Sequence, residues 1–155
     1  MPSLKVRLAD IASSRFAAHG DFSIWTDGDL LCYDVTGPFN LEWVQALGLA
    51  RRQIVGSWRP RHRVGALVHW HRSSLMSPEA LQAYEEGFAQ FKQTSVGPAA
   101  LAWVADGSVE GMVLLRRHFD ALFRKNAVNF RFFDDLAAGR AWVEQEVARV
   151  HQAGR

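Results

Sequence analysis

Hydrophobic and polar positions along this chain switch between two periods, and each switch predicts a new secondary-structure element. Stretches that alternate, or that are almost wholly apolar, predict strands. Five stretches have this character: Phe22–Thr26, Leu30–Thr36, Val64–Trp70, Ala99–Ala105 and Asn129–Phe133. The tight turn Asp27-Gly28-Asp29 joins the first two, so we expect them to form an antiparallel hairpin.

Apolar residues recur at helical spacing in four other segments, which predicts four amphipathic helices. Their apolar stripes are Trp43, Ala46, Leu47, Ala50 and Ile54; Leu81, Tyr84, Phe88 and Phe91; Met112, Leu115, Phe119 and Leu122; and Leu136, Val143, Val147 and Val150. Residues that cap helices precede three of them: Asn40, Ser77 followed by Pro78, and Asp134 or Asp135. The break Gly37-Pro38 separates the second strand from the first helix.

The predicted order is β-β-α-β-α-β-α-β-α. Strands that alternate with amphipathic helices form largely parallel sheets, and the opening hairpin adds an antiparallel pair. We therefore expect an α/β fold with a mixed sheet of about five strands flanked by four helices. Residues 21–155 contain no linker or repeat and are expected to form a single domain. Residues 1–20 fit both helical and strand spacing, and we interpret them as an N-terminal arm.

Composition narrows the class of protein. The chain has 155 residues, of which 48% are hydrophobic and 22% charged, as in ordinary globular domains. The net charge of +2 is too small to indicate a nucleic-acid partner, and the basic residues Arg51–Arg63 lack any recognised nucleic-acid motif. No apolar stretch approaches the roughly 20 residues of a membrane span, and a cytoplasmic location is the default expectation. The single cysteine, Cys32, is expected to be a buried free thiol.

The motifs of the commonest enzyme classes are absent: there is no phosphate-binding GxxxxGK[ST], GxGxxG, HExxH, GxSxG or CxxC. His69 and His71 are the sharpest metal candidates, because residues two apart on a strand point the same way. A third ligand is missing nearby, and Glu79 or His118 could join only through the fold. The sequence alone therefore assigns no metal, no cofactor and no catalytic residue. Asp34 is interpreted as a hairpin residue that serves turns.

A polar segment lies between the strand that ends near Trp70 and the helix that begins at Ser77. In open α/β sheets, binding sites favour the crevice beyond the carboxyl ends of the strands. Arg72, Ser73 and Ser74 lie in that position, ahead of a helix N-terminus that suits an anion. The anion could be a phosphate attached to Ser73 or Ser74. We therefore predict a binding or regulatory site at His69, His71, Arg72, Ser73, Ser74 and Ser77.

Two runs give the chain a family resemblance. The first run is Tyr33–Asn40, which leads into the first helix. The second is Asn129–Val143, a phenylalanine-rich strand followed by an acidic cap and an Ala-x-x-Trp helix. Together with the order of elements, these runs resemble the SpoIIAA-like branch of the STAS superfamily. The resemblance spans about residues 19–147. The same layout is similar to the lipid-binding CRAL-TRIO architecture.

The resemblance implies a mixed sheet flanked by helices, used as a non-enzymatic regulatory or ligand-binding module. Its relatives include anti-sigma-factor antagonists that are regulated by serine phosphorylation. Their serine opens the helix after the third strand, in an Asp-Ser-Ser-Gly-type motif. The matching region here is His71–Leu75, where the Asp and the Gly are absent and Arg72 occupies the acidic position.

Our leading hypothesis is a regulatory or binding module without catalysis, whose partner is a protein or a small apolar ligand. Abundant Phe and Trp beside strands of small residues motivate a first alternative, a carrier or sensor of a lipid-like molecule. A second alternative is a metal-dependent enzyme that uses His69 and His71. Homodimer formation is also left open by the sequence.

Overall fold

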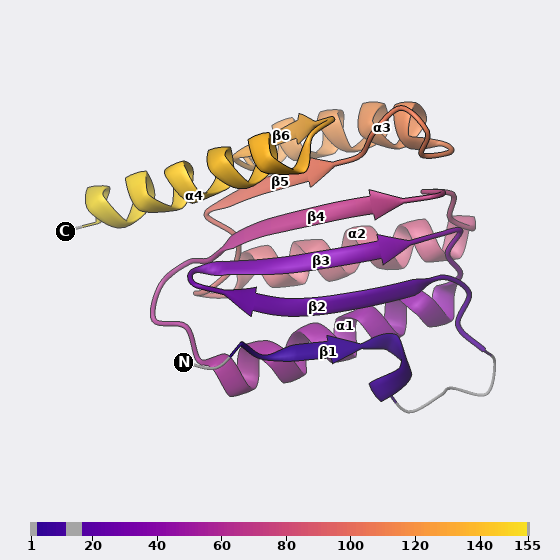
Figure 1. Cartoon of the computed structure of the whole chain (residues 1–155), viewed down its shortest axis with the longest axis horizontal. Coiled ribbons are helices and arrows are strands. Elements are labelled where there is room, and N and C mark those ends of the chain that lie inside the picture. The colour runs from indigo at the N-terminus through magenta and orange to yellow at the C-terminus, as the bar shows by residue number, and fades with distance from the viewer. Residues whose placement is uncertain (1–2, 12–16, 155) are drawn as a thin grey trace.

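The computed structural model describes residues 3–11 and 17–154, and its centre is a six-stranded mixed sheet (Figure 1). The strands lie in chain order and are β1 (Lys5–Arg7), β2 (Asp21–Asp27), β3 (Leu30–Thr36), β4 (Gly65–His71), β5 (Ala100–Val104) and β6 (Phe130–Phe133). The helices are α1 (Leu41–Trp58), α2 (Pro78–Gln93), α3 (Met112–Lys125) and α4 (Leu136–Ala153), with a short 3-10 turn at Leu8–Asp10.

The expected α/β class, mixed sheet and four flanking helices are confirmed, with one strand more than predicted. β1, β2 and β3 pair antiparallel, whereas β3 to β6 run parallel. The additional strand is β1, whose Val6 pairs with Ile24 of β2 and packs against the core. Three residues are too few to establish an alternating pattern, so only the pairing with β2 selects strand over helix for this segment. Residues 1, 2 and 12–16 of the expected N-terminal arm lie outside the described residues.

Helices cover the two faces of the sheet unequally. α1, α2 and α3 lie behind the sheet in Figure 1, and α4 crosses the front. The core under α1, α2 and α3 is large and aromatic, and it contains the fully buried Trp43, Trp70 and Trp103. The core under α4 is smaller and joins apolar residues of β3, β4 and β5 to Val143 and Val147.

The three predicted helix starts are confirmed by capping hydrogen bonds. The Asn40 side chain accepts from Trp43 N at 3.1 Å, and Ser77 Oγ accepts from Ala80 N at 3.2 Å. Of the two acidic candidates before α4, Asp135 caps the helix, accepting from Ala138 N at 2.9 Å. These caps satisfy N–H groups that have no partner inside the helix, so they fix where each helix begins.

Small residues determine where α4 sits on the front face. A Cβ on Gly65 would lie 2.7 Å from Val147 Cγ2, and a Cβ on Gly139 would lie 2.6 Å from Val104 Cγ2. The C-terminal half of α4 therefore packs on the beginning of β4, and its first turn packs on the end of β5. The carboxyl ends of β3 and β4 on this face are left partly open to solvent.

Candidate functional site

Two histidines and one aspartate meet on the front face at the carboxyl ends of β3 and β4. His69 and His71 point the same way because they are two residues apart on β4, and Asp34 pairs in register with His69 on the parallel strand β3. Asp34 Oδ1 accepts a hydrogen bond from His71 Nε2 at 2.5 Å, and it lies 3.7 Å from His69 Nδ1. We call these three residues the histidine cluster.

The histidine cluster is accessible but not fully exposed. The side chains of Asp34, His69 and His71 expose 48%, 29% and 41% of their surface, so solutes can reach all three. Partial burial lowers the pKa of His69, and the adjacent His71 lowers it further, while Asp34 and Asp106 oppose this shift. His69 therefore tends to be neutral near pH 7, with a nitrogen lone pair free to accept a proton or a cation.

A polar hollow of about 330 Å³ adjoins the cluster. Its lining comprises Asp21, Phe22, Ser23, Asp34, Thr36 and His71, from β2, β3 and β4. Hydroxyl, carboxylate and imidazole groups dominate this lining, so the hollow suits water, ions or a small polar molecule. It does not suit an apolar ligand.

The loop between β4 and α2 holds its serines inside the protein. Ser73 and Ser74 are each only 2% exposed, although the flanking Arg72 is exposed and has a left-handed backbone with φ of 64°. Ser73 Oγ donates to Glu110 Oε1 at 2.9 Å, and Ser74 Oγ donates to the Glu110 carbonyl oxygen at 2.9 Å. Both hydroxyls thus tie this loop to the segment before α3, and a kinase would reach them only after the loop opened.

The structure brings together some of the predicted site residues and separates others. His69 and His71 face the front of the sheet, whereas Ser73 and Ser74 turn to Glu110 and Ser77 caps α2. A binding role for the loop residues stays a prediction. Glu79 and His118 do not join the histidines among the described residues, and His118 pairs with Glu85 instead.

Sequence reasoning missed Asp34 and Glu110 as site residues. Asp34 was interpreted as a turn residue, but it lies inside β3, five residues from Asp29, the nearest residue of the hairpin turn. The signal that could have identified Asp34 is its position near the end of β3. In a parallel pair, a polar residue there lies beside the polar residues near the end of β4. Glu110 lies 36 residues from Ser74 and carries no local signal.

A second hollow runs along the back of the molecule between α1 and α2, and we call it the α1–α2 groove. It consists of two adjoining parts of about 440 and 520 Å³, which share Gly48, Arg51, Arg52, Gly87 and Gln90. Apolar side chains supply most of the remaining wall: Val44, Leu47, Leu49, Val55, Ala83, Tyr84, Phe88, Phe91 and Val96. Glycines open the groove, since a Cβ on Gly56 would meet no atom within 4 Å.

Arg51 places a half-buried positive charge in the lining of this groove. Its guanidinium lies 5.2 Å from the centre of the Phe91 ring, and Nη2 donates to the Gly87 carbonyl oxygen at 3.4 Å. Burial raises the pKa of the nearby Tyr33 and Tyr84 hydroxyls, an effect that the Arg51 charge opposes in both. Within the described part of the chain, no carboxylate pairs with Arg51 or Arg52. The α1–α2 groove therefore combines apolar walls with two arginines, and its lining also includes the exposed carboxylate of Glu86.

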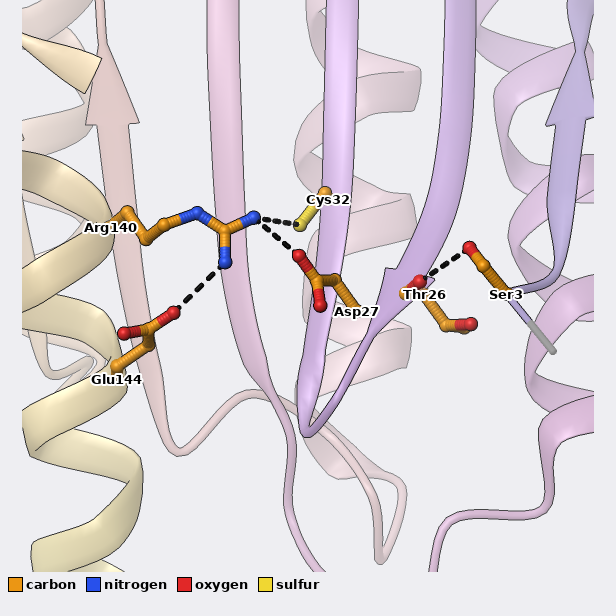
Figure 2. Close-up of polar contacts among 6 residues, drawn as sticks. All are labelled: Ser3, Thr26, Asp27, Cys32, Arg140 and Glu144. Atoms are coloured by element: carbon orange, nitrogen blue, oxygen red, sulfur yellow. Dashed lines mark hydrogen bonds and ion pairs between the residues drawn. The ribbon is translucent and has the colours of Figure 1, made fainter. Parts of the chain in front are cut away.

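The thiol of Cys32 lies under α4 and is not part of either hollow. Figure 2 shows Arg140 reaching from α4 toward Cys32 and Asp27 while its other nitrogen contacts Glu144. Arg140 Nη2 lies 2.7 Å from Asp27 Oδ2 and 4.0 Å from Cys32 Sγ. Burial raises the pKa of Cys32 to about 11, although the Arg140 charge lowers it in part.

We expect Cys32 to resist thiol reagents in the folded protein. At pH 8 the thiol is protonated and 1% exposed, and the thiolate is the reactive form. Mixing native protein with a disulfide reagent at pH 8 should give no colour over minutes, and one thiol per chain should react after unfolding in guanidinium. Rapid reaction of the native protein at the rate of a free thiol would contradict this burial.

Comparison with known proteins identifies the fold through a solved structure. No family model and no curated protein matches the chain. It is similar to the crystal structure of an uncharacterized protein from the DUF3478 family, with a SpoIIAA-like fold, from Shewanella loihica PV-4. The two chains are 13% identical, the match covers 85% of this chain and 99% of the other, and the TM-score is 0.59. This similarity shows that the chain has a SpoIIAA-like fold, in agreement with the resemblance inferred from the sequence.

Among the described helices, none has the length and apolar character needed to cross a membrane.

Proposed function

We propose that the protein is a non-enzymatic binding module of SpoIIAA-like type that takes a small amphipathic molecule in the α1–α2 groove. The observation that carries this proposal is the groove itself, which joins apolar walls to Arg51 and Arg52, two arginines that pair with no carboxylate of the described residues. The ligand class follows from these walls: an apolar body with an anionic group. The SpoIIAA-like fold supports a regulatory or binding role of this kind.

The packing of the two helices supports a ligand over a purely structural gap. Gly48 and Gly56 on α1 and Gly87 on α2 line the groove, where larger side chains would close it. Glycine inside a helix costs about 0.5–1 kcal/mol relative to alanine. Three such positions along one groove therefore cost stability without filling space, which is expected of a surface shaped to admit another molecule.

The burial of the loop serines favours ligand binding over serine phosphorylation as the event that regulates the protein. Ser73 and Ser74 are buried and hydrogen-bonded, whereas the α1–α2 groove is open to solvent over two helices. A small molecule can enter the groove without opening the fold.

The test is binding of dodecanoate, compared with dodecanol as its uncharged counterpart, by native mass spectrometry and calorimetry. We expect dodecanoate to bind once per chain and dodecanol to bind more weakly, because only the carboxylate can pair with Arg51. Equal binding of both would remove the role of Arg51, and no binding of either would contradict the ligand class. Gently purified protein should also carry a co-purifying amphiphile.

Replacing Gly48 with leucine is expected to abolish dodecanoate binding, since the new side chain would project into the groove. The nearest atom to a Cβ at this position is Arg52 Nη1 at 3.6 Å, so alanine fits without displacing the backbone. The matched control Gly48→Ala should keep binding and raise the free energy of unfolding by about 0.5–1 kcal/mol, since it removes a helical glycine. Thermal unfolding should show both variants folded; undiminished binding by Gly48→Leu would place the ligand elsewhere.

A further inference from the structure

We propose that Asp34, His69 and His71 bind one divalent transition-metal ion, with Zn²⁺ as the best-matched probe. Within the described residues these three side chains form a group in which one ligand atom from each lies within 4.8 Å of the other two. This site is separate from the α1–α2 groove, since α1 and α2 cover the opposite face of the sheet. The inference therefore does not depend on the proposed function.

The donor set selects the kind of metal. Two imidazole nitrogens and one carboxylate oxygen are ligands of zinc sites that keep an open position, and of non-haem iron sites. Mg²⁺ and Ca²⁺ prefer sites made wholly of oxygen ligands. The histidine cluster is therefore expected to discriminate against these two abundant ions.

The spacing of the donors is close to what an ion requires. Ligand atoms about 2.0–2.2 Å from a tetrahedral ion lie about 3.3–3.6 Å from one another. His69 Nδ1 is 3.7 Å from Asp34 Oδ1, and His71 Nε2 is 2.5 Å from the same oxygen. The ion would take the place of the proton in the short His71–Asp34 hydrogen bond while small side-chain rotations widen the gap. A neutral His71 imidazole would then carry its proton on Nδ1, whereas a protonated one would release the Nε2 proton to solvent.

The backbone already holds the three donors in place. Asp34 and His69 are directly paired across β3 and β4, and His71 follows two residues later on the same strand. Both strands lie in the interior of the sheet, with paired neighbours on each side. Only side-chain torsions have to be ordered when the metal binds, so little backbone entropy opposes binding.

The remaining coordination positions would face water. The polar hollow of about 330 Å³ begins at Asp34 and His71 and includes the hydroxyls of Ser23 and Thr36. These hydroxyls are available to hydrogen-bond a metal-bound water or anion. The competing explanation is that Asp34 and His71 form a simple surface hydrogen bond with His69 nearby, and the experiment must separate the two.

The experiment is calorimetric titration of Zn²⁺ into full-length protein that carries no histidine tag and has been stripped with a chelator. We expect one ion per chain in the wild type. Each of Asp34→Asn, His69→Gln and His71→Gln should weaken binding by about tenfold or more, since even indirect partners of a ligand cost 10–100-fold. The control His118→Gln removes a histidine that pairs with Glu85 away from the cluster, and it should leave the affinity unchanged.

Two further measurements keep the proposal falsifiable if a variant fails to fold. In the wild type, Zn²⁺ should shift the imidazole ¹⁵N resonances of His69 and His71 and leave the other four of the six histidines in place. Excess Mg²⁺ should not displace the zinc. The proposal is overturned if each of the three cluster variants still binds Zn²⁺ as tightly as the wild type, or if Zn²⁺ shifts the resonances of other histidines. It is also overturned if the wild type binds none of Zn²⁺, Ni²⁺ and Co²⁺. None of these outcomes would change the dodecanoate result.

Discussion

Replacing Trp103 with alanine is expected to lower the free energy of unfolding by about 4 kcal/mol, because loss of a buried Trp or Phe costs about 3–5 kcal/mol. Trp103 is 1% exposed and lies at the centre of the aromatic core. Its ring centre is 4.9 Å from that of Trp70, 5.0 Å from Phe119 and 5.5 Å from Phe123. Removal would leave a cavity bounded by rigid rings that cannot collapse into it.

Urea unfolding followed by circular dichroism measures this loss. Trp103→Phe should cost less, because a phenyl ring restores part of the contact with Phe119 and Phe123. Val113→Ala provides the control: Val113 is 75% exposed, so the change should stay within about 0.5 kcal/mol of the wild type. A loss below 1 kcal/mol for Trp103→Ala would mean that the aromatic core is not packed as described.

Replacing Gly37 with alanine is expected to cost about 2–3 kcal/mol, near the upper end of what overpacking costs. A Cβ at this position would lie 2.2 Å from the Ser73 carbonyl oxygen and 2.7 Å from the Phe39 ring. The first of these is backbone and cannot rotate away. Gly37 N also donates to the His71 carbonyl oxygen at 3.4 Å, and Phe39 N donates to that of Leu75 at 2.8 Å.

The same substitution should disturb the loop after β4 before it unfolds the sheet. Hydrogen exchange should therefore speed up at Ser73 and Leu75 by more than at β5. The matched control is Gly107→Ala, at another loop glycine, where a Cβ would meet nothing within 4 Å. Equal stability of the two variants would contradict the close approach between Gly37 and Ser73.

The α1–α2 groove and the polar hollow beside the histidine cluster lie on opposite faces of the sheet and differ in chemistry. The α1–α2 groove on the back is mostly apolar and contains the half-buried Arg51, and the histidine cluster on the front is polar and partly exposed. Because α4 packs closely through Gly65 and Gly139, it leaves the ends of β3 and β4 uncovered. The absence of familiar catalytic motifs in the sequence is compatible with binding at either surface.

The sequence predicted most of the fold because its determinants are local. Asn40, Ser77 and an aspartate before α4 cap helices through contacts that span three residues, and these positions were correct. Period and apolar runs located five strands and four helices. The strand β1 was missed because a three-residue segment has too few positions for a period, and its pairing with β2 depends on residues 16 to 20 positions away.

The candidate sites lay largely beyond local information. Period two placed His69 and His71 on one face of a strand, but Asp34 joins them only because β3 and β4 pair in parallel with Asp34 opposite His69. Ser73 and Ser74 were expected ahead of a helix N-terminus as part of a binding or regulatory site, and the structure buries them in contact with Glu110. The α1–α2 groove depends on the distance in space between α1 and α2, which are separated in the sequence by β4.

By itself, the sequence determined most of the elements, their order, their caps and the α/β class, since these follow from propensity and hydrophobic period over short windows. The SpoIIAA-like fold was implied only by the family resemblance of two runs. Only the tertiary structure decided which polar side chains meet. Strand register and helix packing brought Asp34 to the histidines, turned the loop serines inward and held α1 and α2 apart around Arg51. Such contacts join residues more than thirty positions apart, and no local pattern encodes them.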